Sequence, residues 1–196
     1  GQYHMNRIYG ELPALHKYCS ARSGKIGLIG CGNYAFACIA HYVAQSSCHA
    51  LRGVMDSNIN KAASLYKAYK SFFYTDDSTL ITSDPIISLV FIASNHASHA
   101  EYAIDCINAG KHVHIEKPHV VSSDQLRRLL DAMRGNPESK VFLGFNRPRS
   151  LLFGCLQNHL RLQSGPLMIN WFIAGHEISD DHWYFNEDEG GRVLGN

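Results

Sequence analysis

The sequence predicts an α/β fold in which a parallel sheet carries helices on both of its faces. From Lys25 onward, apolar runs of strand length alternate with segments of helical periodicity, the pattern of βαβ units joined by right-handed crossovers. The run from Leu89 to Ala93 is apolar throughout, as expected of a parallel strand covered on both sides. A composition of 45% hydrophobic and 18% charged residues over 196 positions is enough for a core.

The first half of the predicted sheet contains three strands and two helices. Residues 25–29 form the first strand, and a glycine-containing turn leads from it into a helix over 33–45. The second strand covers 51–55. Asn58 is a good helix cap, and we expect the next helix to run from it to about Ala68. Residues 72–74 form a short third strand.

The second half repeats this alternation. After the apolar strand over 89–93, a helix covers 98–108 and ends before Gly110, a residue typical of helix ends. Residues 112–115 form the next strand. A helix over 123–133 follows, capped by Ser122 or Ser123, and the last strand covers 141–145.

Three regions are expected along the chain. Residues 1–23 are a mixed lead-in segment with a short helix around Leu12 to Tyr18, and residues 24–146 form the sheet domain. Residues 147–196 begin a C-terminal α+β domain, with a helix over 151–162 and a strand over 167–174. Some fifty residues are few for an independent domain, so we expect the chain to be a fragment of a longer protein.

Composition excludes several classes of partner. A net charge of +1 without basic clusters argues against nucleic-acid binding, and no apolar run is long enough to span a membrane. The six cysteines form no CxxC pair and no signal peptide is visible, which favours a cytoplasmic location. His112, His114 and His119 lie close together, but no cysteine or carboxylate set completes a tetrahedral site, so no metal is expected.

A GxGxxA motif follows the first strand and opens the first helix. Gly30 permits a tight turn, Gly32 lets a pyrophosphate approach the backbone, and Ala35 allows close packing of helix on strand. The helix N-terminus, with Asn33 and Tyr34, offers N–H groups and the positive end of the helix dipole. The motif predicts a Rossmann-type dinucleotide-binding domain; the alternative is a tight turn that binds no ligand.

Asp56 ends the second strand, about twenty residues after the glycines. A carboxylate at this place binds the ribose hydroxyls of NAD and repels the 2′-phosphate of NADP. NAD is therefore the expected cofactor. Lys61 would weaken that preference, so NADP stays possible.

Polar side chains follow the most apolar strand. Ser94, Asn95, His96 and His99 lie where the carboxyl end of a parallel strand meets its ligand. We expect them to line the cofactor site. For His99, packing against or capping the next helix is an equal alternative.

Glu116-Lys117-Pro118 closes the following strand. A lysine at this rim can bind a substrate oxygen or the nicotinamide ribose, and its charge favours a developing alkoxide. The alternative is an ordinary solvated lysine.

Together these segments resemble the glucose-fructose oxidoreductase / inositol dehydrogenase family, Gfo/Idh/MocA. The resemblance rests on residues 25–35 and 94–99, on the Ala-Gly-Lys-His-Val…Glu-Lys-Pro stretch over 109–118, on 144–147, and on the glycine-rich 189–194. It implies a Rossmann domain followed by the beginning of an α+β substrate domain. It also implies hydride transfer between NAD(P) and a secondary alcohol of a sugar, cyclitol or sugar nucleotide.

The resemblance assigns further roles. Lys117 would be the catalytic lysine, preceded by Glu116 at the cofactor and followed by a cis peptide bond to Pro118. Asn146 and Arg147 would lie near the nicotinamide. The general acid/base would be a histidine beyond Asn196. Independently of the resemblance, His176 in its polar cluster and the aromatic Trp183 are candidate substrate contacts; the alternatives are a loop near the domain junction for His176 and a core position for Trp183. The apolar strand of the C-terminal sheet is a candidate surface for a homo-oligomer.

Two alternatives from other classes remain. A non-catalytic dinucleotide-binding sensor or scaffold would use the same fold, because fold does not fix function. A methyltransferase also has a glycine loop and an acidic strand end, but its loop usually lacks a Glu-Lys-Pro rim.

Overall fold

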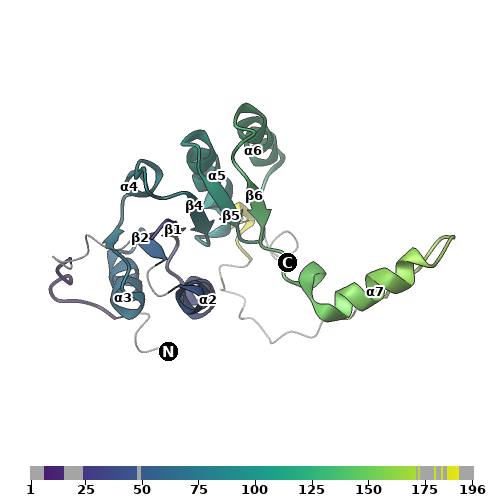
Figure 1. Ribbon diagram of the computed structural model, residues 1–196, viewed down its shortest axis with the longest axis horizontal. Coiled ribbons are helices and arrows are strands. Elements are labelled where there is room, and N and C mark those ends of the chain that lie inside the picture. Colours follow the sequence, from purple (N-terminus) through teal and green to yellow (C-terminus); the bar gives the residue numbers. More distant parts are fainter. Residues whose placement is uncertain are drawn as a thin grey trace.

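The computed structural model describes residues 7–15, 24–47, 50–170, 172, 179, 182 and 185–189. Its centre is a six-stranded parallel sheet of strand order β3-β2-β1-β4-β5-β6 (Figure 1). This confirms the predicted fold class. The strands are β1 (Ile26–Ile29), β2 (Leu51–Met55), β3 (Phe73–Thr75), β4 (Leu89–Ile92), β5 (His112–Ile115) and β6 (Val141–Leu143).

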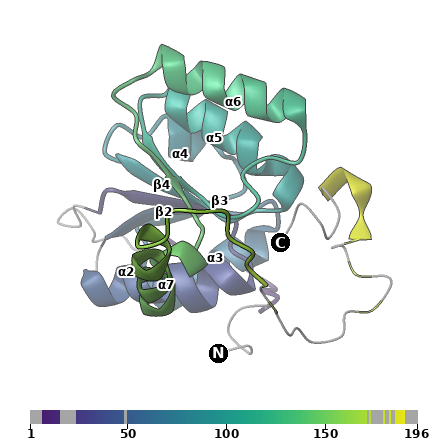
Figure 2. The ribbon, with the colours of Figure 1, turned by 90° about the vertical axis from the view of Figure 1, so that its right-hand side faces the viewer.

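Helices cover the sheet on both sides, with α2 and α3 on one face and α5 and α6 on the other (Figure 2). The side chains of β1 alternate between the two cores: Leu28 packs toward Phe36 and Leu65, whereas Ile29 belongs to the core of α5 and α6. The helices over the sheet are η1 (Ala35–Ile39), α2 (Ala40–Ser46), α3 (Ile59–Tyr69), α4 (Thr79–Thr82), η2 (His96–Ser98), α5 (His99–Asn108) and α6 (Ser123–Gly135).

The expected caps are present. Asn58 begins α3, and its side chain accepts a hydrogen bond from the backbone N–H of Asn60 at 3.1 Å. Ser122 begins α6 in the same way and accepts from Gln125 N at 3.2 Å. Each cap satisfies a backbone donor that has no partner within its helix.

The short helix α4 was not predicted. Its one buried residue, Ile81, fills the space above two glycines of the sheet. A Cβ added to Gly27 would lie 2.8 Å from the Cγ2 atom of Ile81, and a Cβ on Gly53 would lie 2.7 Å from its Cδ1 atom. Glycine in β1 and β2 therefore lets α4 pack directly on the strand backbone.

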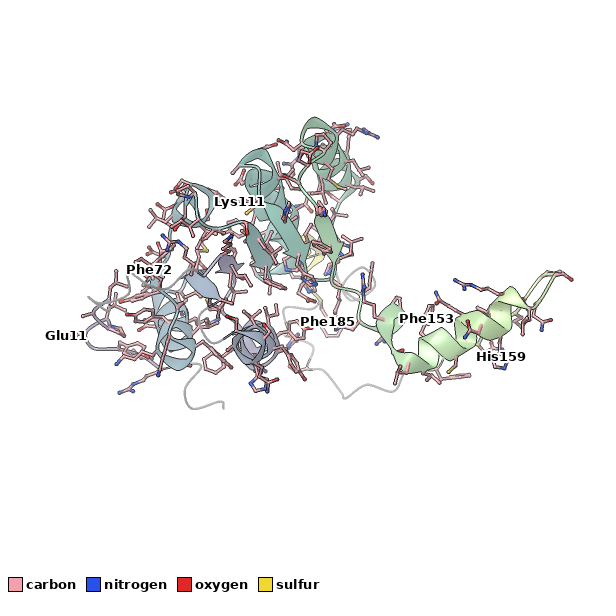
Figure 3. All side chains as sticks on the ribbon, viewed as in Figure 1. Glu11, Phe72, Lys111, Phe153, His159 and Phe185 are labelled. Atoms are coloured by element: carbon pink, nitrogen blue, oxygen red, sulfur yellow. The ribbon has the colours of Figure 1, made fainter. Side chains whose placement is uncertain are left out.

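Lys111, within the Ala-Gly-Lys-His-Val stretch, has a structural place. Its side chain is buried, and Nζ donates to the carbonyl oxygens of Asp84 at 2.7 Å and Ile87 at 2.9 Å. Figure 3 shows the labelled Lys111 at the sheet, away from α7. Lys111 thus joins the start of β5 to the turn before β4.

The short helix predicted around Leu12 to Tyr18 is wrong in its described part, because residues 12–15 are not helical. Pro13 disfavours the helical conformation of Leu12, the residue before it. The segment instead lies along α3 and β3: the carbonyl of Pro13 accepts from Tyr74 Oη at 2.7 Å, and that of Ala14 from Tyr66 Oη at 3.3 Å. Residues 16–18 lie outside the described part of the chain.

After β6 the chain leaves the sheet. The turn η3 (Arg147–Arg149) leads into α7 (Leu151–Arg161), which extends away from the sheet with Phe153 and His159 well clear of it (Figures 1 and 3). The strand predicted over 167–174 is wrong where it can be examined, because residues 167–170 form no strand and are exposed. A strand needs a neighbour for its backbone groups, and no described residue pairs with this segment. Among the described residues, no helix is long and apolar enough to cross a bilayer.

Candidate cofactor site and active site

The candidate site begins at the adjacent ends of β1 and β4. Gly30 follows β1 with φ of 89°, and a Cβ there would lie 2.5 Å from the carbonyl carbon and oxygen of Ala93. Only glycine allows this turn to press against the neighbouring strand end. The sheet reverses its strand order between β1 and β4, and ligands of open parallel sheets bind at such a point.

A first cavity of about 380 Å³ opens over this point on the side of β2. Asp56 lies at its wall and uses both carboxylate oxygens: Oδ2 accepts from Cys31 N at 2.7 Å, and Oδ1 accepts from Asn58 N at 2.8 Å. Asp56 therefore fixes the glycine turn and the start of α3 as well as facing the cavity. The polar or glycine lining is Gly30, Gly32, Asp56, Ser57, Lys61, Ser94, Asn95 and Tyr102.

A second cavity of about 510 Å³ opens on the side of β5. It shares Gly32, Ala93 and Ser94 with the first cavity, so the two meet above the ends of β1 and β4. We call the two cavities together the groove. The other residues of the second cavity are Asn33, Tyr34, Ala37, Cys38, His96, His99, Glu116, Lys117 and Asn146.

Lys117 and Glu116 come from the end of β5. The Lys117–Pro118 peptide bond is cis, as the resemblance implied, and Lys117 lines the second cavity together with Asn33 and Tyr34. Glu116 is buried, and burial raises the pKa of its carboxyl group. A Cβ on Gly144 would lie 2.8–2.9 Å from that carboxyl group, so the glycine after β6 makes room for it.

Tyr34 and Asn146 lie far apart in the sequence but meet at the wall of the second cavity. Asn146 Nδ2 donates to Tyr34 Oη at 3.3 Å. Burial raises the pKa of the Tyr34 hydroxyl, which therefore stays protonated at neutral pH. The pair joins the first helix to the turn after β6.

A sequence model of the oxidoreductase family with an NAD-binding Rossmann fold, Gfo/Idh/MocA, matches residues 24–145. These residues include the glycine turn, Asp56, the loop after β4 and Lys117. The chain belongs to this family.

Known members show how much of such a protein the chain covers. Over 108 residues it is 30% identical to Oxidoreductase P35 of Formosa agariphila, covering 55% of this chain and 34% of that protein. Over 137 residues it is 29% identical to inositol 2-dehydrogenase of Salmonella typhimurium, covering 59% of this chain and 40% of that protein. The chain thus spans about a third to two fifths of these relatives.

The same domain is found in solved structures. A levoglucosan dehydrogenase in complex with NADH is 28% identical to the chain and superposes with a TM-score of 0.57, over 63% of this chain and 35% of that one. The scyllo-inositol dehydrogenase of Lactobacillus casei is 22% identical to the chain and shares its fold, with a TM-score of 0.65 over 70% of this chain and 41% of that one. The family that matches this domain is described as having an NAD-binding Rossmann fold.

His99 holds two loops of this family domain together. Its ring is 1% exposed, with Nδ1 2.7 Å from the carbonyl oxygen of Pro118 and Nε2 3.0 Å from that of Ser94. Burial lowers the pKa of the imidazole, and the two carbonyl contacts act in the opposite direction. Of the two alternatives, this geometry favours packing, because both ring nitrogens face protein oxygens.

Some sequence candidates lie outside the groove. Ala35 is 1% exposed and packs in the core beneath the turn. Arg147 lines a neighbouring cavity with Lys117, His119 and Phe145 instead. His176 and Trp183 lie outside the described residues. Within the described part, no three His, Cys, Asp or Glu side chains are grouped to hold a metal ion.

Sequence reasoning missed several lining residues, among them Tyr102 and Cys38. Tyr102 lies one turn after Ser98 on the helix that follows the polar loop, and Cys38 lies one turn after Tyr34. Helical spacing of three or four residues from a known site residue was the signal that could have found them.

The histidines around the site predict a loss of stability in mild acid. Burial is the main cause that lowers the pKa of His96, His99, His114 and His119. The unfolded chain, with histidine pKa values of about 6.5, therefore binds more protons than the native one just below that pH. The raised pKa values of the Glu116 and Asp105 carboxyl groups act in the opposite sense, but as two groups against four.

We expect the free energy of unfolding to fall by at least about 1 kcal/mol between pH 7.5 and pH 5.5, since each such group contributes up to about 1.4 kcal/mol per pH unit. Urea unfolding at both pH values measures this. A His99→Gln variant, which cannot titrate, should show a smaller dependence. If the protein is equally stable or more stable at pH 5.5, these histidine rings are not held neutral by burial in the native state.

Proposed function

We propose that the protein is an NAD-dependent dehydrogenase that moves hydride between NAD and a secondary alcohol of a sugar, cyclitol or sugar nucleotide. The observation that carries this proposal is one groove with Asp56 at one end and Lys117 at the other. The names of relatives support the substrate class, since they include inositol 2-dehydrogenase and levoglucosan dehydrogenase.

The groove fits a dinucleotide. A Cβ added to Gly32 would meet no atom within 4 Å, so its backbone faces open space where a pyrophosphate can approach. We propose that Gly30, Gly32 and Asn33 hold the pyrophosphate and that Asp56 holds the adenosine ribose. We propose that Asn95 contacts the cofactor in the first cavity, and that Tyr34, Ser94, His96, Glu116, Lys117 and Asn146 contact its nicotinamide side.

In the proposed mechanism, Gly30, Gly32, Asn33 and Asp56 would hold NAD, which would supply the acceptor for the hydride of the alcohol carbon. Lys117 binds the alcohol oxygen and stabilises its developing negative charge, an effect strengthened by the low dielectric of the groove. Glu116 directly precedes Lys117, is buried, and lines the same cavity as Lys117. From the family resemblance, we propose that a histidine of the substrate domain takes the hydroxyl proton.

Asp56 makes NAD the preferred cofactor. Its carboxylate would face the 2′-phosphate of NADP at short range, and the repulsion disfavours that cofactor. Lys61 lines the same cavity and offsets part of the repulsion. NADP therefore remains a weaker alternative.

Titration of NAD and NADP tests the proposal. Asp56→Ala should weaken NAD binding by about 1–3 kcal/mol, the cost of losing charged hydrogen bonds. It should also reduce the difference in affinity between NAD and NADP. Asp76→Ala is the matched control, because Asp76 follows the neighbouring strand β3 and is exposed. Since Asp56 also holds Cys31 N and Asn58 N, circular dichroism must first show that the variant is folded. Unchanged NAD affinity in a folded Asp56→Ala protein would refute the assignment.

We also propose that residues 147–196 begin a substrate domain and that the protein is a cytoplasmic homo-oligomer. The described cysteines Cys31, Cys38, Cys106 and Cys155 are free thiols, which supports a reducing compartment. The side chains of Leu151 and Met168 are 92% and 89% exposed, which supports further contacts for this region.

A further inference from the structure

The segment that ends at Glu189 returns to the groove. The turn η5 (Glu187–Glu189) contacts η2, which begins directly after Asn95 (Figure 2). This contact joins two segments about ninety residues apart in the sequence.

Glu189 makes the contact with both of its carboxylate oxygens. Oε1 accepts from Asn95 Nδ2 at 2.7 Å, and Oε2 accepts from the backbone N–H of Ala97 at 2.8 Å. Its carbonyl oxygen lies 3.3 Å from His96 Nδ1. Hydrogen bonds to a charged carboxylate are stronger than neutral ones, and a negative charge is favourable at the N-terminus of a helix.

The neighbours of Glu189 do not share this position. Glu187 and Asp188 belong to the same turn and are exposed, whereas Glu189 is half-buried. The contact is therefore specific to one of three adjacent acidic residues and is not a general effect of their charge.

The loop that Glu189 holds lines both parts of the groove. Asn95 lines the first cavity and His96 the second. Any shift of this loop moves the walls of both cavities at once.

We infer that Glu189 is a positioning residue, which fixes the Asn95–Ala97 loop and thereby couples cofactor binding to the docking of residues 185–189. The inference rests on the proposed function, because it takes the groove to be the NAD site. Coupling is reciprocal: if docking improves NAD binding, NAD must stabilise docking by the same factor.

The test combines hydrogen exchange with NAD titration in the full-length protein. In the wild type, NAD should slow exchange of the Ala97 amide and of residues 185–189. Glu189→Gln keeps the shape of the side chain, but its NH2 group then faces one of the two loop donors and its single oxygen accepts from the other alone. It should speed exchange at both places, lower NAD affinity at least about fivefold, and remove the protection of 185–189 by NAD. Glu187→Gln, in the same turn, should behave like the wild type.

A double variant separates coupling from general weakening. Asn95→Ala removes one partner of Glu189, so adding Glu189→Gln to it should cost less affinity than Glu189→Gln costs alone. If each substitution merely lowered the stability of the protein, the losses of NAD affinity caused by the two substitutions would be additive in the double variant.

The outcomes distinguish the two proposals. If the wild type binds no NAD, the proposed function fails, and faster exchange of Glu189→Gln without cofactor still supports the docking contact. If NAD binds wild type and Glu189→Gln equally and protects residues 185–189 in both, the positioning role is overturned and the NAD site stands.

Discussion

Replacing Gly30 with alanine is expected to abolish NAD binding and to lower the free energy of unfolding by about 2–4 kcal/mol. At φ of 89° an L side chain is strained, and the added Cβ would lie 2.5 Å from the carbonyl group of Ala93. The carbonyl carbon and oxygen of Ala93 are backbone atoms at the edge of the groove. They cannot rotate away from the added Cβ as a side chain could, so β1 and β4 must move apart to relieve the clash. Urea unfolding and NAD titration measure the two effects.

Gly32→Ala is the matched control two residues away. Its Cβ would meet no protein atom within 4 Å, so stability should change by less than about 0.5 kcal/mol. NAD affinity should nevertheless fall, because the methyl group would stand where the pyrophosphate approaches. A stable Gly30→Ala protein that binds NAD normally would contradict the described turn, and a Gly32→Ala protein with unchanged affinity would move the pyrophosphate elsewhere.

Lys117→Met should lower turnover by about 10²–10³-fold, the effect of removing one preorganised group that stabilises a developing oxyanion. The comparison uses the full-length protein and the polyol, found in a panel of sugars and cyclitols, that best supports NAD reduction. NAD affinity should change much less than turnover, because the glycine turn and Asp56 still hold the adenosine half. Steady-state rates and NAD titration on the same preparation separate the two.

Lys140→Met is the control for loss of a lysine. Lys140 is exposed and precedes β6, at the opposite end of the strands from the groove. Its replacement should leave turnover unchanged. If Lys117→Met turns over like the wild type, Lys117 is a solvated surface lysine, and the catalytic group must be sought among Tyr34, Glu116 and His96.

The strands could be predicted because parallel strands covered on both faces are short apolar runs that few other structures produce. β2 and β5 begin and end at the predicted residues. The helix α4 could not be predicted, since one turn with a single buried residue, Ile81, has no periodicity. The strand expected over 167–174 had the composition of a strand but no partner among the described residues.

The candidate site could be predicted as far as it follows strand ends. Gly30, Asp56, Ser94 and Lys117 each lie within two residues of the end of a strand of one parallel sheet, so the topology brings them to the same edge. Arg147 was placed near the groove by resemblance, but it lines the neighbouring cavity, whereas the adjacent Asn146 lines both that cavity and the groove.

The contacts that tie the site together were not predictable from local sequence. The bonds from Asp56 to Cys31 N and from Glu189 to Ala97 N join a side chain to a distant backbone group. Every residue has a backbone N–H, so nothing in the sequence marks these particular ones.

The position of β1 between β2 and β4 has a consequence for synthesis of the protein. Ile26 pairs with Leu51, in the next strand along the chain, but also with Leu89, which leaves the ribosome much later. The first three strands can pair before β4 has been made. At that stage β1 has no partner on its second side, and the groove above the ends of β1 and β4 has not yet formed. NAD can stabilise only states that bind it. It therefore cannot assist the nascent chain until the turn after β5 has been made, and from then on it favours the completed sheet over any half-assembled one.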